Sequence, residues 1–280
     1  MVIWFLSLVF LLSCRPILGQ TSQELPPYTL PNTEVRILES KYVDNMVYKI
    51  DIALPESYRQ SDELYPTLYF LDSWFYYGIV VQTYRALRIL KEIPELIIVG
   101  ISHFGEDIMD DVRYRSRDYT PTRVDSTFWL PVTGGGPQFQ KFISNELFPL
   151  IDSNYRTRKD DRTICGFSAG GIFCTYIMFN HPGMFQRYII GGPAAWYDNH
   201  IVLKYEKEYS LQHHDLPVKI FMTVGEHEDE GQITGWKLLT DSIESRNYQG
   251  LEMTSKQIEG EGHVSQALIG LIKGMQDVFK

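Results

Sequence analysis

The sequence predicts an α/β fold in which a mostly parallel sheet of eight strands has helices on both faces. From residue 66 onward, short apolar runs rich in Val and Ile alternate with segments of helical spacing. This alternation is typical of βαβ units around a buried parallel sheet. In addition, 44% of the 280 residues are hydrophobic, which is enough to build a large core.

The elements follow from local patterns. The domain is expected to span residues 34–280 and to begin with an antiparallel hairpin, because β-branched and alternating residues flank a turn at 43–45. Its strands are predicted at 35–42, 47–55, 66–72, 95–102, 162–167, 185–192, 218–225 and 251–259. Helices are predicted at 77–92, 137–155, 170–182, 201–212, 235–247 and 264–279. Residues 103–137 show no clear period and are expected to form a long irregular insert, which in a compact domain is usually functional or mobile.

The N-terminus indicates export. Residues 1–19 are expected to be a signal peptide, because the apolar run at 1–14 is shorter than a membrane span and Gly19 offers a cleavage site before Gln20. Residues 20–33 would then form a polar, proline-rich arm. The predicted mature protein is secreted or periplasmic, without a stable membrane span. The alternative is a lipoprotein anchored at Cys14, since "LLSC" resembles a bacterial lipobox.

The charge and the cysteine content of the chain argue against a nucleic-acid-binding protein and against a disulfide-rich protein. A formal net charge of -9 and an isoelectric point near 5.3 argue against nucleic-acid binding, which needs clustered Lys and Arg. Removal of a signal peptide would leave Cys165 and Cys174, which lie in apolar segments and are predicted to be buried core residues. A disulfide framework is therefore not expected.

Ser168 is the predicted nucleophile. It stands in "CGFSAGG", a Gly-x-Ser-x-Gly stretch between a predicted strand and a predicted helix. In this nucleophile elbow a sharp turn projects the serine oxygen above the carboxyl end of the sheet. Gly166 and Gly170 allow the two backbones to approach. The N–H of Ala169 would point to the place where an oxyanion forms.

A serine hydroxyl needs a base and a carboxylate that orients the base. In α/β hydrolases these partners follow in the order Ser, acid, His, with the His after the last strand. His263 has that position and is the predicted base. Glu226, Glu228 and Asp229 all follow the strand at 218–225, so residue order alone leaves the acid open.

The chain resembles the putative-esterase (esterase D-like) family of α/β hydrolases, which includes siderophore esterases and S-formylglutathione hydrolases. The resemblance runs from about residue 35 to the C-terminus. It is carried by "LYFLDSWFYY", "VGIS", "RSRDYTPT", "GGGPQFQKFISNELFPLIDSNYRT", "GFSAGG" and "GGPAAWY".

The resemblance implies the α/β-hydrolase fold and several site residues. The family's acid lies three residues after the glycine that closes its strand, and from Gly225 this spacing implies Glu228. The second oxyanion donor would be the N–H of Ser73 or Trp74, where relatives often carry glycine at the first position. Arg117 in "RSRDYTP", or Arg113 two residues before this stretch, would contact substrate. The alternative for these arginines is a surface ion pair with an aspartate, the candidates being Asp110, Asp111 and Asp118. Trp196 lies at a strand's carboxyl end and would form either a pocket wall or core packing.

Taken together, these residues predict a serine esterase that forms an acyl-enzyme on a small-molecule ester, without cofactor or metal. Two alternatives remain open: an acyltransferase on the same fold and a non-catalytic binding protein. Siderophore esters, feruloyl esters, acetylated sugars and peptide-linked acyl groups are all possible substrates.

Overall fold

The computed structural model describes residues 27–105 and 107–280, of which Asn32–Lys280 form one compact unit. The predicted signal peptide lies outside the described residues, so it stays a prediction. Within the described chain, no helix is both long and apolar enough to cross a bilayer.

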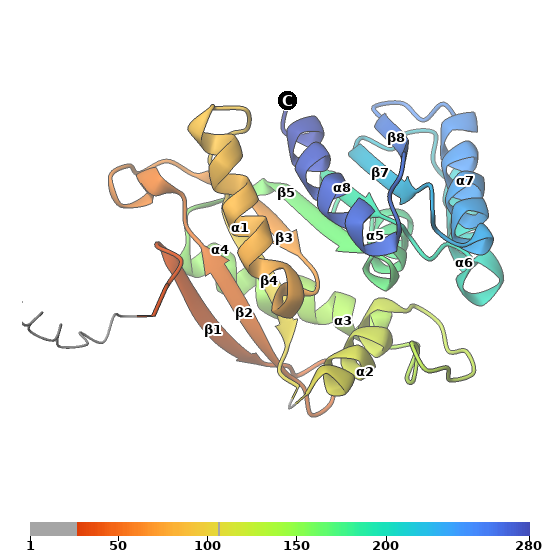
Figure 1. Ribbon diagram of the computed structural model, residues 1–280, viewed down its shortest axis with the longest axis horizontal. Coiled ribbons are helices and arrows are strands. Elements are labelled where there is room, and N and C mark those ends of the chain that lie inside the picture. Colours follow the sequence, from red (N-terminus) through yellow and green to blue (C-terminus); the bar gives the residue numbers. More distant parts are fainter. Residues whose placement is uncertain (1–26, 106) are drawn as a thin grey trace, which may run out of the picture. The chain divides into compact units, whose positions relative to one another are not determined.

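An eight-stranded sheet forms the centre of the unit, in the order β1-β2-β4-β3-β5-β6-β7-β8. Strand β2 is antiparallel to β1 and to β4, and the pairs from β4 to β8 are parallel (Figure 1). The strands are β1 (Thr33–Glu39), β2 (Val47–Ala53), β3 (Tyr65–Phe70), β4 (Ile97–His103), β5 (Thr157–Phe167), β6 (Arg187–Gly191), β7 (Lys219–Gly225) and β8 (Glu252–Ile258). The predicted fold class is confirmed.

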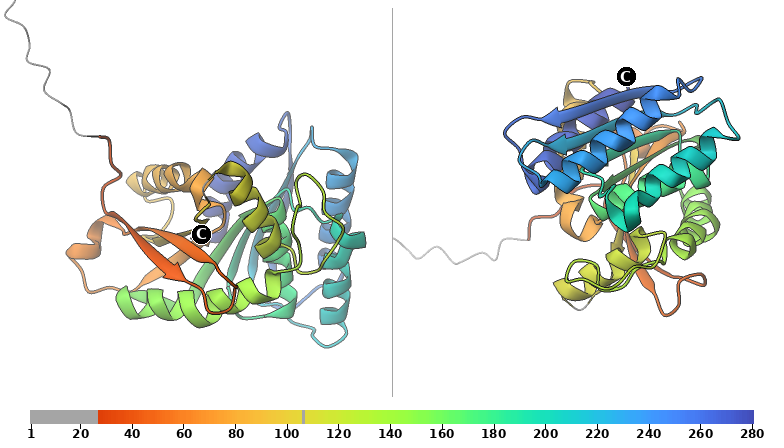
Figure 2. Two further views of the ribbon diagram at one scale, coloured as in Figure 1. Left: turned by 90° about the horizontal axis from the view of Figure 1, so that it is seen from below. Right: turned by 90° about the vertical axis from the view of Figure 1, so that its right-hand side faces the viewer.

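Helices cover both faces of the sheet. Helices α1 and α8 contact each other on one face, and α3 to α6 lie on the opposite face (Figures 1 and 2). The α-helices are α1 (Ser73–Ile89), α2 (Ile108–Tyr119), α3 (Gly136–Phe142), α4 (Phe148–Asn154), α5 (Ala169–Asn180), α6 (Tyr197–Ser210), α7 (Glu230–Ser245) and α8 (His263–Val278). A short 3-10 helix, η1 (Glu56–Arg59), precedes β3, and a π-helical turn, η2 (Ile143–Leu147), joins α3 to α4.

The core reflects the apolar runs of the sequence. All residues of β3 and β4 are buried, because these central strands have helices on both sides. Helix α5 is buried along its length except at Asn180. Cys165 and Cys174 are free and buried, as predicted, and burial raises the pKa of both thiols, so they remain protonated and pack as apolar groups.

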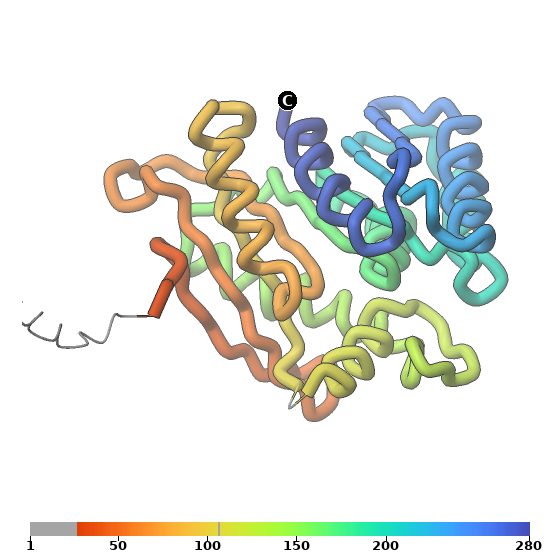
Figure 3. Tube along the Cα trace, viewed as in Figure 1, coloured from red at the N-terminus to blue at the C-terminus, as the bar shows by residue number. Residues whose placement is uncertain are grey.

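The prediction of an irregular insert at residues 103–137 is wrong in its first half, where helix α2 lies. Asp107 caps this helix by accepting hydrogen bonds from the N–H groups of Met109 and Asp110. The buried side of α2 carries Ser116, Asp118 and Tyr119. A search for apolar periodicity misses such a helix, because Ser116 and Asp118 are buried through hydrogen bonds to other groups and replace part of the usual apolar stripe. Residues 120–135 form a long loop beside α2 (Figure 3).

Candidate active site

Ser168 occupies a strained turn between β5 and α5. Its backbone angles are φ 56° and ψ -119°, a combination that costs a residue with a side chain about 1–3 kcal/mol. Hydrogen bonds hold it there: its N–H donates to the Gly191 carbonyl at 2.9 Å, and its carbonyl accepts from the N–H of Gly171 at 2.9 Å. The turn thus has the strand–turn–helix arrangement expected of a nucleophile elbow.

The neighbouring glycines are sterically required. A Cβ on Gly166 would lie 2.5 Å from the Gly170 carbonyl oxygen, and one on Gly171 would lie 2.8 Å from Cα of Pro193. Both distances are shorter than a carbon atom tolerates. The glycine pattern therefore reflects the close approach of β5, α5 and the loop after β6.

Glu228 and His263 contact each other directly. The Nδ1 atom of His263 lies 2.5 Å from Oε2 of Glu228, and the other carboxylate oxygen accepts the N–H of Gly225 at 2.9 Å. The Glu228 side chain is 1% exposed, whereas that of His263 is 45% exposed. The imidazole is therefore bound at Nδ1 by a buried carboxylate, while much of the rest of the side chain is open to solvent.

Backbone hydrogen bonds join the two loops that carry this pair. The N–H of His227 donates to the Glu261 carbonyl at 2.9 Å, and that of Glu226 donates to the Ile258 carbonyl at 3.0 Å. A Cβ on Gly225 would overlap the Glu261 carbonyl, so glycine at the end of β7 lets the loops meet. The other two candidate carboxylates have different contacts: Glu226 accepts the N–H of Gly260, and Asp229 caps α7.

Ser168 and Glu228 both adjoin the glycine pair Gly191–Gly192 at the end of β6. Gly191 accepts the Ser168 N–H, and a Cβ on Gly192 would lie 3.0 Å from Oε1 of Glu228. The three predicted residues therefore gather at the carboxyl edge of the sheet, with Ser168 after β5, Glu228 after β7 and His263 after β8.

A buried glutamine that the sequence did not reveal supports the histidine loop. Gln266 is fully buried; its amide donates to the His263 carbonyl at 3.2 Å and accepts from the Thr223 hydroxyl at 2.9 Å. It lies one turn beyond His263 on α8, a spacing that places both residues on one side of the helix.

Two helix N-termini flank the elbow. Ala169 is the first residue of α5 and Ser73 the first of α1, and the first N–H groups of a helix have no intrahelical partner. The residue that needs a left-handed backbone is Asp72, at φ 57°, so Ser73 does not require glycine. The Ser73 hydroxyl instead donates to buried Asp51 at 2.7 Å.

Comparison with known proteins places the chain in a family. The model of the family described as "Putative esterase" matches residues 40–266. The chain belongs to this family. It is an esterase, a hydrolase of carboxylic esters, and the resemblance inferred from its motifs is confirmed.

Several relatives align over most of the esterase. It is 30% identical over 257 residues to the ferri-bacillibactin esterase BesA of Bacillus subtilis, covering 85% of this chain and 86% of that protein. The crystal structure of the BES protein from Bacillus cereus has 29% identity and a TM-score of 0.82, covering 93% of this chain and 100% of the other. An IroE-like serine hydrolase from Shewanella oneidensis has 27% identity and a TM-score of 0.77, covering 88% and 80%.

Trp196 lies at the carboxyl side of β6 and is 43% exposed. Its indole N–H donates to Oε1 of Gln232 at 2.8 Å, and the amide nitrogen of that glutamine donates to the Pro193 carbonyl at 2.6 Å. This exposure argues against core packing, and the bond to Gln232 restrains the ring orientation; the role as a pocket wall stays a prediction.

The predicted arginines have unequal surroundings. Arg113 is exposed, whereas Arg117 donates to Oδ1 of Asp118 at 2.7 Å. Asp118 is fully buried and also bonds to Tyr48 and His103. Burial acts to raise the pKa of Asp118, but the bonds from His103 and Arg117 lower it by more, so the carboxylate stays charged. Of the two interpretations of Arg117, substrate contact or an ion pair, the structure contains the ion pair. Its partner Asp118 is buried and not at the surface. Substrate contact by either arginine stays a prediction.

The arginine that reaches the elbow region is Arg115, which sequence reasoning missed. It binds both carboxylate oxygens of Asp72, each at 2.9 Å. Burial acts to lower the pKa of Arg115, but the Asp72 carboxylate raises it by more, so the guanidinium is charged. Arg115 and Tyr119 are four residues apart on α2, a spacing that only a helix prediction would have revealed.

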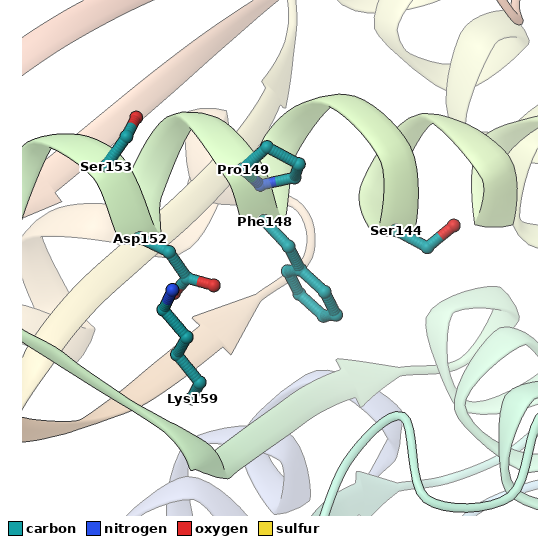
Figure 4. A pocket seen from close by; sticks show the side chains of 6 residues that line it. All are labelled: Ser144, Phe148, Pro149, Asp152, Ser153 and Lys159. Carbon is teal, nitrogen blue, oxygen red and sulfur yellow. The ribbon is translucent and has the colours of Figure 1, made fainter.

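A hollow of about 410 Å³ lies elsewhere on the esterase, beside α4 and the start of β5 (Figure 4). Its lining residues are Ser144, Phe148, Pro149, Asp152, Ser153 and Lys159. Lys159 is near the first residue of β5, whereas Ser168 follows the last. The hollow is therefore separate from the candidate active site, and its Asp152 is already bonded to Thr157 and Arg162.

Proposed function

We propose that the esterase cleaves its substrate through an acyl-enzyme on Ser168, with His263 as the base and Glu228 as the carboxylate that orients it. The observation that carries this proposal is the 2.5 Å contact between Glu228 and Nδ1 of His263, on loops that leave the same edge of the sheet as the strained Ser168 turn. A carboxylate on Nδ1 leaves Nε2 as the atom that can accept a proton from a serine hydroxyl.

The proposed reaction has two halves. His263 takes the Ser168 proton as Oγ attacks the ester carbonyl, and Glu228 stabilises the imidazolium that forms. The N–H of Ala169 and that of Ser73 or Trp74 bind the negative oxygen of the tetrahedral intermediate. The C–O bond to the alcohol then breaks, and the alcohol leaves with the proton held by His263. Water attacks the acyl-enzyme by the same steps, which releases the acid and restores Ser168.

For the substrate we propose a siderophore ester. Support comes from the name of the relative that is 30% identical, a ferri-bacillibactin esterase. The half-exposed indole of Trp196, held by Gln232, offers an apolar face for a large substrate next to the elbow.

An ester panel tests both parts of the proposal. Purified protein is incubated with a small activated ester, ferric and iron-free siderophore esters, a feruloyl ester and an acetylated sugar, and Ser168→Ala serves as control. We expect the highest kcat/KM on a siderophore ester and no turnover by the variant. Preference for another ester would overturn the substrate class alone. An active Ser168→Ala variant would overturn the mechanism.

A further inference from the structure

Asp72, between β3 and α1, has an unfavourable backbone for a residue with a side chain. It lies in the left-handed region at φ 57° and ψ 39°, where its carbonyl accepts the first hydrogen bonds of α1, from Phe75 at 3.0 Å and Tyr76 at 3.1 Å. This region costs a residue with a side chain about 1–2 kcal/mol, although Asp adopts it more readily than most. Contacts from outside its own segment therefore help to keep Asp72 in this conformation.

Helix α2 supplies that restraint at two points. Arg115 forms a two-pronged ion pair with the Asp72 carboxylate, whose side chain is 5% exposed. The Asp72 N–H donates to the Tyr119 hydroxyl at 3.1 Å, and the Arg115 guanidinium lies over the Tyr119 ring at 5.4 Å from its centroid. The fork geometry of arginine fixes the carboxylate in direction as well as distance.

The restrained residue directly precedes the N–H groups proposed as the second oxyanion donor, those of Ser73 and Trp74. The adjoining strand end is aligned with the elbow, because the Leu71 N–H donates to the Cys165 carbonyl at 3.0 Å. A Cβ on Gly170 would lie 3.3 Å from the Leu71 side chain, so Leu71 packs against the start of α5. A change in the backbone of Asp72 would therefore move a donor relative to Ser168.

We propose that Arg115 is a positioning residue for the second oxyanion donor, acting through the Asp72 carboxylate. This inference rests on the proposed acyl-enzyme mechanism. Arg115 does not contact the substrate: it keeps the turn between β3 and α1 in the conformation that aims the N–H at the developing negative charge. Its removal should raise the energy of the transition state while leaving ground-state binding nearly unchanged.

The test compares Arg115→Gln, Arg115→Lys and Asp72→Asn on one activated ester. We expect Arg115→Gln and Asp72→Asn to lower kcat about tenfold to a hundredfold, less than complete loss of a donor, with KM changed less than about threefold. Arg115→Lys keeps the positive charge but not the pair of N–H donors that bind both carboxylate oxygens, and should lose less activity than Arg115→Gln. Phenylboronic acid, which forms a negatively charged tetrahedral adduct on serine, should lose affinity in proportion to kcat.

Arg246→Gln is the matched control. Arg246 also forms a two-pronged pair with a buried carboxylate, that of Glu206, at 2.9 and 3.1 Å, but this pair joins α6 to the residue that follows α7. We expect the Arg246→Gln substitution to lower the melting temperature without changing kcat or the affinity for the boronate.

Unchanged kcat in the Arg115 and Asp72 variants would overturn the inference, as would a loss of kcat with unchanged boronate affinity. Ser168→Ala keeps the two proposals separate. If that variant is inactive while the Arg115 variants turn over normally, the positioning role alone fails; if it stays active, the proposed function fails.

Discussion

The buried carboxylate of Glu228 contacts the half-exposed imidazole of His263 across 35 residues of sequence, at 2.5 Å. The contact forms because β7 and β8 are parallel neighbours, so the loops after them leave the same edge of the sheet. The same edge carries Ser168 after β5. Chain topology, more than local sequence, therefore places these three residues at the same edge of the sheet.

Ser168→Ala should abolish turnover of a small activated ester while the protein stays folded, because the other members of a triad contribute little without the nucleophile. The wild-type protein should gain the mass of one acyl or phosphonyl group after reaction with a slow ester or a fluorophosphonate, and the variant should gain none. Turnover near the wild-type level in the variant would contradict the assignment.

Substitutions of the three carboxylates that follow β7 should differ sharply in their effect on kcat. Glu228→Gln should lower kcat about a hundredfold or more, because the amide no longer stabilises the imidazolium. Glu226→Gln and Asp229→Asn should change kcat only a few-fold, since these side chains bond to Gly260 and to the N-terminus of α7 rather than to His263. All three are measured on one substrate. A dominant loss at Glu226 or Asp229 would show that the acid is misassigned.

The nucleophile elbow and the fold could be predicted from the sequence, because each corresponds to a recognisable local pattern of residues. Apolar runs revealed the buried strands, and the Gly-x-Ser-x-Gly spacing revealed the turn. Local patterns did not choose among the acids after β7. That choice came from the resemblance, and the structure gives only Glu228 of the three candidates a contact with His263.

The ion pair between Arg115 and Asp72 could not be predicted from the sequence, for two reasons. Helix α2 is polar on average and buries Ser116 and Asp118 beside Tyr119, so its buried side is not marked by a run of apolar residues. The partners Asp72 and Arg115 are also 43 residues apart, and charge alone does not select one arginine from Arg113, Arg115 and Arg117. Gln266 was missed for a related reason, because its role depends on contacts with Thr223 and the His263 carbonyl.

We propose that the exported protein begins at Gln20, as the cleavage-site pattern at Gly19 predicts. Intact mass spectrometry of protein recovered from the secreting cell would show this N-terminus. A diacylglycerol-modified Cys14 would instead establish the lipoprotein alternative.

Gly100→Ala should disturb the start of α1 from the neighbouring strand β4. A Cβ at this position in β4 would overlap the Ser73 hydroxyl and lie 2.6 Å from the Phe70 ring. We expect a loss of about 1–3 kcal/mol in the free energy of unfolding and a lower kcat, because Ser73 must shift. Gly78→Ala on α1 is the control: its Cβ would have no neighbour within 4 Å, and alanine favours a helix. Equal effects of the two variants would contradict this explanation.

Stability should fall in acid partly through Glu206. This fully buried carboxylate accepts hydrogen bonds from Arg246, Ser242 and Tyr248. Burial acts to raise the pKa of Glu206, but these bonds lower it by more. Because the folded-state pKa is depressed, the contribution is complete above the ordinary pKa of a glutamate, about 4.3, and is lost as the pH falls through the lower folded value.

Glu206→Gln should therefore reduce the free energy of unfolding by about 1–3 kcal/mol at pH 7 and by progressively less below pH about 4.3. Urea unfolding of wild type and variant at pH 7, 4 and 3 measures the difference. Glu208→Gln provides the control, because Glu208 is exposed and its nearest cation, Lys204, is 3.8 Å away, a pairing that contributes little. A Glu206→Gln deficit that stays constant across this pH range would mean that the ionisation of Glu206 is not the source of the acid sensitivity.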